Sequence, residues 1–111
     1  MTEQTSCRCF QGSFRFDEVE TTPLGQDQYF AEISLNRCKA CDSVWLHYFY
    51  ENEAFEKSGR WFCGWLNPDQ IRIIAASNNA REILESLDWY FAGGSYFDGK
   101  VSRTSGKIIL P

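Results

Sequence analysis

The chain has 111 residues, 43% of them hydrophobic and 23% charged, with a formal net charge of −4 and a sequence pI near 4.9. This length and composition predict a single folded domain over residues 1–111, with one modest core that gains from a covalent or metal staple. The acidic balance, with no cluster of Lys and Arg, argues against nucleic-acid binding, because cations that meet phosphates supply most of that affinity.

The N-terminal stretch MTEQTSCRCF has neither a basic region nor an apolar run, so it does not have the pattern of a signal peptide. The most apolar runs, VWLHYFY and IRIIAA, are too short to cross a bilayer. We therefore expect a cytoplasmic protein with no membrane contact.

Alternating or aromatic-rich segments predict strands along the first two thirds of the chain. Thr21–Asp27, with Pro23 and Gly25, is typical of a turn region, and Ser43–Tyr50 is apolar on both faces, as a central strand is. The connection Glu51–Gly59 is polar. The expected strands are Ser13–Val19, Gln28–Leu35, Ser43–Tyr50, Arg60–Leu66 and Gln70–Ile74.

A helix is expected after Asn79, which stands in the capping position with Glu82 three residues later. Gly93 is placed to end it. Turn signals follow at Asp98-Gly99 and Ser105-Gly106, and a short last strand is expected at Ile108–Leu110. The apolar stripe of the helix is Ala80, Ile83, Leu84, Leu87 and Phe91.

These elements predict an α+β fold, an antiparallel sheet with a metal site at one edge and one main C-terminal helix. The metal site is expected from four cysteines: a CxC pair at Cys7 and Cys9, and a CxxC pair at Cys38 and Cys41. Cys thiolates are common ligands of tetrahedral structural zinc. Disulfides are uncommon in the cytosol, and five cysteines is an odd count.

The 28 residues between the two pairs hold two candidate strands joined by a turn. A hairpin brings its ends together, so both pairs should meet at the same edge of the sheet. The residue after Cys41 is Asp42, where such turns often carry Gly, and Asp tolerates the left-handed backbone better than most residues.

Over Cys7 to Tyr50 this arrangement resembles a zinc ribbon, closely in its CxxC half and more loosely in its CxC half. The second half of the chain is similar in general type to small bacterial proteins, some of which serve as immunity partners of toxins. The resemblance implies a structural zinc held by Cys7, Cys9, Cys38 and Cys41.

Other uses of the four cysteines stay open: iron in the same cage, as in rubredoxin-like electron carriers, two disulfides, a reactive CxxC pair, or free thiols. Charge favours a metal, because Arg8, Arg37 and Lys39 stand in or beside the pairs. Zinc with four thiolates carries a net charge of −2, so the loaded chain would carry −6, from −4 and −2.

Cys63 stands alone in its strand and is expected in the core, and His47, the one histidine, is expected to serve packing or an interface. Gly93-Gly94-Ser95 follows the helix, so it is not a phosphate loop. No catalytic constellation is visible, and four thiolates close the zinc shell, so we do not expect an enzyme.

The sequence therefore predicts a small zinc-binding protein that acts through contact with another protein or as a homodimer. The candidate interface is Trp45, Phe49 and Trp61, because one helix covers only about two strands of one sheet face. The alternatives are a toxin-immunity-type partner, an iron electron carrier and a nucleic-acid-associated ribbon.

Overall fold

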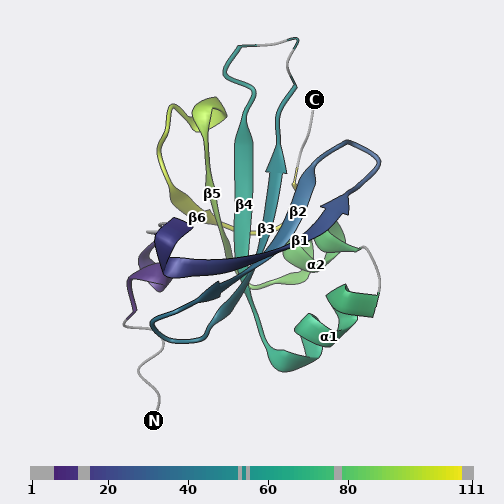
Figure 1. Cartoon of the computed structure of the whole chain (residues 1–111). Helices are drawn as coiled ribbons and strands as arrows, with labels where there is room; N and C mark the ends of the chain where they lie inside the picture. Colours follow the sequence, from purple (N-terminus) through teal and green to yellow (C-terminus); the bar gives the residue numbers. More distant parts are fainter. Residues whose placement is uncertain (1–6, 13–15, 53, 55, 77–78, 109–111) are drawn as a thin grey trace.

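The computed structural model describes residues 7–12, 16–52, 54, 56–76 and 79–108. Six antiparallel strands form one open sheet in which each strand pairs with the next along the chain (Figure 1). The strands are β1 (Val19–Gln26), β2 (Glu32–Cys38), β3 (Val44–Tyr50), β4 (Arg60–Leu66), β5 (Tyr90–Gly93) and β6 (Ser102–Thr104). The predicted α+β class is confirmed.

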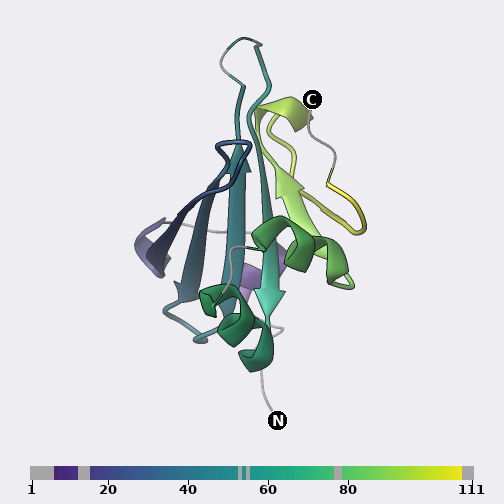
Figure 2. The same cartoon turned by 90° about the vertical axis from the view of Figure 1, so that its right-hand side faces the viewer.

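Two helices, α1 (Pro68–Ala76) and α2 (Ala80–Ser86), connect β4 to β5 in the described chain and cover one face of the sheet (Figure 2). The described residues also include three short 3₁₀ helices: η2 (Arg8–Gln11), η3 (Phe16–Glu18) and η4 (Ser95–Phe97). The N-terminal segment with η2 lies on the opposite side of the sheet from the helices (Figures 1 and 2).

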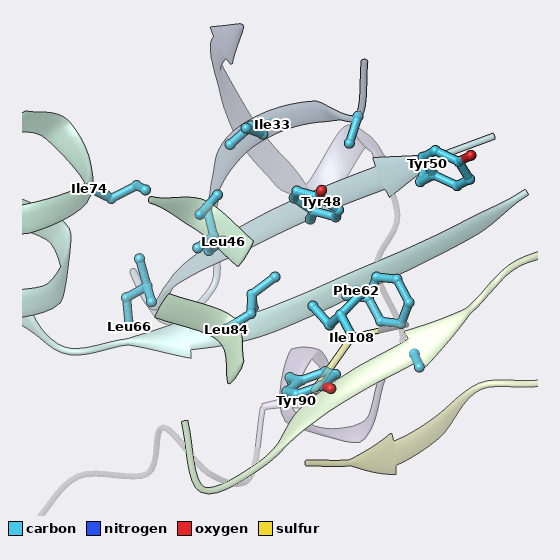
Figure 3. Close-up of a cluster of buried hydrophobic side chains, with 13 residues drawn as sticks. Ile33, Leu46, Tyr48, Tyr50, Phe62, Leu66, Ile74, Leu84, Tyr90 and Ile108 are labelled. Carbon is cyan, nitrogen blue, oxygen red and sulfur yellow. The ribbon is translucent and has the colours of Figure 1, made fainter. Parts of the chain in front are cut away.

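Alternation along β3 divides the interior into two clusters, one on each face of the sheet. Leu46, Tyr48 and Tyr50 point towards the helices, and Trp45 points the other way. The helix-side cluster is built on β2 to β5 and α2 and is closed by Ile108 from the C-terminal segment (Figure 3). Each large apolar side chain buried there contributes about 1.5–3 kcal/mol.

The predicted central strand at 43–50 and the strand at 60–66 are confirmed, but the first hairpin lies later in the chain than expected. The predicted turn Thr21–Asp27 forms most of β1, and residues 28–31 form the turn instead. Pro23 and Gly25 fit in β1 because it is an edge strand whose register shifts between them. Of the strand predicted at 13–19, residues 13–15 lie outside the described residues, and η3 occupies 16–18.

The turn before β2 is stabilised by the carboxylate of Asp27, a polar residue that the pattern of apolar side chains does not single out. Its carboxylate accepts the backbone N–H groups of Tyr29 at 2.9 Å and Ala31 at 3.1 Å. It also accepts the hydroxyl of Tyr48 from β3. These three bonds fix where β1 ends and β2 begins.

The strand predicted at Gln70–Ile74 is wrong, because these residues lie in α1. Asn67 and Gln70 form a reciprocal cap, in which each amide oxygen accepts the other residue's backbone N–H at 2.9 Å. Pro68 begins the helix at the position that tolerates proline. The fold therefore has two helices where one main helix was expected.

The helix after Asn79 is confirmed but ends at Ser86, so Leu87 is its C-cap and Phe91 and Gly93 lie in β5. At the C-terminus, β6 is Ser102–Thr104. Of the strand predicted at 108–110, Ile108 is buried without belonging to a strand, and the other two residues lie outside the described ones.

Gly64 of β4 lets α2 approach the sheet closely. A Cβ atom there would lie 2.4 Å from Leu87 Cδ1 and 2.8 Å from Leu84 Cδ2.

We predict that Gly64→Ala lowers the free energy of unfolding by about 1–3 kcal/mol through overpacking. In a Leu87→Ala background the cost of Gly64→Ala should fall by at least half, and chemical denaturation of the four proteins measures this. An equal cost in both backgrounds would contradict the packing account.

Candidate metal centre

The four cysteines of the CxC and CxxC pairs lie together, as the sequence predicts. Their Sγ atoms are all within 4.8 Å of one another. Cys7 Sγ lies 3.7 Å from Cys38 Sγ, and Cys9 Sγ lies 3.6 Å from Cys41 Sγ. All are free thiols, so the two disulfides left open by the sequence are not present in the structure.

The hairpin of β1 and β2 brings the two pairs to the same place. Val19, at the start of β1, pairs with Cys38, at the end of β2. The backbone N–H of Lys39 donates to the carbonyl of Glu18 at 2.9 Å, which ties the N-terminal approach to the CxxC turn. Cys9 lies in η2, where the N–H of the C-cap residue Gly12 donates to the carbonyls of Arg8 and Cys9.

The CxxC turn has the backbone that its sequence suggests. Asp42 has φ +65°, so it occupies the left-handed region where such turns often carry glycine. Its N–H donates to the carbonyl of Cys38 at 2.7 Å, and the N–H of Cys38 donates to the carbonyl of Ser43 at 2.8 Å. The turn is therefore closed by its own backbone.

The local electrostatics of the sulfurs favour a cation at their centre. Burial raises the pKa of Cys9, and burial also raises the pKa of Cys38 against backbone N–H bonds from Cys41 and Ala40. Burial opposes the shift at Cys41, but hydrogen bonds with Ser43, Cys9 and Cys7 lower its pKa to about 7. Four thiolates facing one another need a positive ion, which would hold all four deprotonated.

Ser43 was not identified from the sequence as part of the site. Its hydroxyl lies 3.1 Å from Cys41 Sγ and its side chain is buried. Second-shell groups of this kind orient metal ligands. The sequence feature that could have indicated this role is the place of Ser43 two positions after Cys41, the second cysteine of the CxxC pair.

The three cations expected around the cysteines are present, and each has acidic or carbonyl partners. Arg8 pairs with Glu18, and Arg37 pairs with Glu20 and Asp42. Lys39 Nζ lies 3.3 Å from the carbonyl oxygen of Asp17. These exposed pairs contribute little stability individually.

The cysteine cluster lies directly against the second hydrophobic cluster. Phe10, which directly follows Cys9, packs edge-on against Trp45 with ring centroids 4.9 Å apart. Trp89 and Phe91 contact Trp45 from the other side, at 6.1 and 5.8 Å. We call residues 7–12 the strap, because they cross this face and carry two of the four sulfurs.

Trp45 was expected on an exposed interface, and its position corrects that expectation. It is 0% exposed, since the strap covers the part of the face on which it lies. Phe49 and Trp61 are half-buried. On the open part of the same face, a groove of about 510 Å³ is lined by Phe49, His47, Ser34 and Pro23 among others, and Trp61 of β4 is the register partner of Phe49.

Cys63 was expected in the core and His47 in a packing or interface role, and both lie outside the group of four gathered cysteines. Cys63 is fully buried in the second cluster and is not among the four gathered sulfurs, and burial raises the pKa of its thiol. His47 stacks on Trp61 with ring centroids 5.9 Å apart, and burial lowers its pKa. Neither residue lies in the cysteine cluster.

No family model matches this sequence, and no curated protein or solved structure matches it significantly either. Within the described ranges, neither α-helix has the length and apolar character that a membrane crossing requires.

Proposed function

We propose that this chain is a small zinc-binding protein whose zinc has a structural role. The observation that carries the proposal is the convergence of four thiols from the strap and the CxxC turn, with sulfur pairs at 3.6 and 3.7 Å. A tetrahedron with Zn–S bonds of 2.3 Å has edges of about 3.8 Å. The sulfur pairs at 3.6 and 3.7 Å match this edge, and no two of the four sulfurs are more than 4.8 Å apart.

A structural role fits better than a catalytic one because all four positions around the ion would be filled by sulfur. Catalytic zinc keeps an open position for water or substrate. The ion would join the strap to the β2–β3 turn, and these two segments are more than 25 residues apart in sequence. Zinc binding of this type supplies folding free energy.

The test of the zinc site compares two buried cysteines. We predict one zinc per chain in the purified protein, and its loss in Cys38→Ala, because three thiolates bind far more weakly than four. The melting temperature should fall with it, by about 4–8 °C for each kcal/mol lost. Elemental analysis and thermal unfolding measure both effects.

The matched control is Cys63→Ala, which removes an equally buried thiol outside the cluster. It should keep one zinc per chain. A Cys38→Ala protein with full zinc would contradict the assignment, and iron in place of zinc would favour the rubredoxin-like alternative.

We further propose that the protein acts through contact with another protein, a second copy included. One observation supports this: half-buried Phe49 lines a groove that the strap leaves open, and half-buried Trp61 is its register partner on β4. Aromatic residues are favoured anchors of interfaces. The loaded chain would be strongly acidic, with a net charge of −6 from −4 and −2, and this opposes contact with nucleic acid.

For the second-copy form of this proposal, we predict a concentration-dependent rise in mass by light scattering. Phe49→Ser should weaken this association at least tenfold, whereas Ile73→Ser, which changes a 53% exposed side chain on α1, should not. A monomer at every concentration would exclude the second copy. Equal association by both variants would exclude this face.

A further inference from the structure

A second hollow, of about 260 Å³, lies where β4 leads into α1 and α2 leads into β5. Figure 2 shows the start of α1 and the end of α2 on the same side of the sheet. The hollow is separate from the four sulfurs and is not used by the proposed function. The side chains relevant to its chemistry are Trp65, Trp89, Asn67, Gln70, Ser86 and Asp88.

Two tryptophans that are held in place by neighbours line this hollow. Trp65 is 36% exposed, and its ring lies 6.3 Å from that of Phe10. Trp89 packs against Phe91 at 5.1 Å, and the Arg103 guanidinium lies 4.1 Å from its ring centroid. The Trp89 ring is therefore fixed from inside the protein, and both indoles line the hollow with apolar surface.

The amides of the hollow are oriented by the cap of α1. The oxygens of Asn67 and Gln70 already accept backbone N–H groups at 2.9 Å. Each amide therefore has its NH₂ group left as the donor for a ligand. The hydroxyl of Ser86 donates to the carbonyl of Ile83 at 2.6 Å, so its oxygen is left to accept.

The mixture of donors and acceptors selects the class of ligand. A cation would have the exposed carboxylate of Asp88 as its one charged partner, against two amide donors and the charge of Arg103 behind Trp89. An anion would meet the same carboxylate with no Lys or Arg in the lining. A wholly apolar ligand would desolvate the amides without pairing them. A sugar ring has hydroxyl groups that both donate and accept, and an apolar C–H face that suits an indole.

We propose that this hollow is a carbohydrate site that takes one pyranose ring. The ring stacks on Trp65, and its hydroxyl groups accept from the amides of Asn67 and Gln70 and donate to the carboxylate of Asp88. The volume limits the site to one ring at a time, so a longer glycan would be bound by a terminal or protruding sugar.

The experiment follows the four tryptophan indole N–H resonances by NMR during titration with glucose, galactose, mannose and N-acetylglucosamine. At least one sugar should give saturable shifts of the Trp65 and Trp89 signals. The dissociation constant should be on the order of 1 mM, which is ordinary for a ligand of about twelve non-hydrogen atoms. Trp65→Ala should weaken binding at least tenfold and Asp88→Asn several-fold.

Phe30→Ala is the matched control, since it removes a 77% exposed aromatic ring from the turn between β1 and β2 and should leave sugar binding unchanged. Zinc content and spectral dispersion show that each variant is folded, and the isosteric Asp88→Asn tests the site if Trp65→Ala fails that check. The proposal is overturned by the absence of saturation with all four sugars or by equal shifts with acyclic sorbitol. Tighter binding of choline or sulfate than of any sugar would also overturn it.

Discussion

The gathering of four sulfurs is the constraint on which the second face of the sheet depends. The helix-side cluster is closed by α1 and α2, which lie between β4 and β5 in the chain, and by the C-terminal segment. Part of the other face is covered by the strap, whose Cys7 and Cys9 sulfurs meet those of Cys38 and Cys41, 31 and 32 positions later in the chain. Phe10 of the strap packs on Trp45 of β3, so the strap helps to bury the aromatic cluster around Trp45, and we propose that a metal at the cysteine site holds the strap in place.

The strands with strong aromatic patterns could be predicted from the sequence, because their side chains alternate between two buried faces. VWLHYFY and RWFCGWL are such cases. The first hairpin could not be placed, since its turn is set by the bonds of Asp27 with Tyr48, a residue 21 positions later. The apolar residues of QIRII favour a strand on their own, but the reciprocal cap formed by Asn67 and Gln70 begins a helix there.

The cysteine cluster was predictable because ligand spacing and a hairpin of roughly equal arms are local properties of the sequence. The face of the sheet to which Trp45 points was predictable too, but the side chains that bury Trp45 were not. That cover comes from Phe10, 35 positions earlier, and from Trp89 and Phe91, more than 40 positions later. Spacing along one strand contains no information about such contacts, and the hollow beside Trp65 was missed for the same reason.

Hydrogen exchange in metal-loaded and metal-stripped protein tests the central claim most directly, which is that a metal ion fastens the strap to the sheet. The N–H of Phe10 donates to the carbonyl of Cys7 at 2.9 Å, and the N–H of Asp42 donates to that of Cys38 at 2.7 Å. Removal of the ion should increase exchange at both amides by at least tenfold, and at the strap more than in α2. Equal protection of the Phe10 amide with and without the ion would contradict the account.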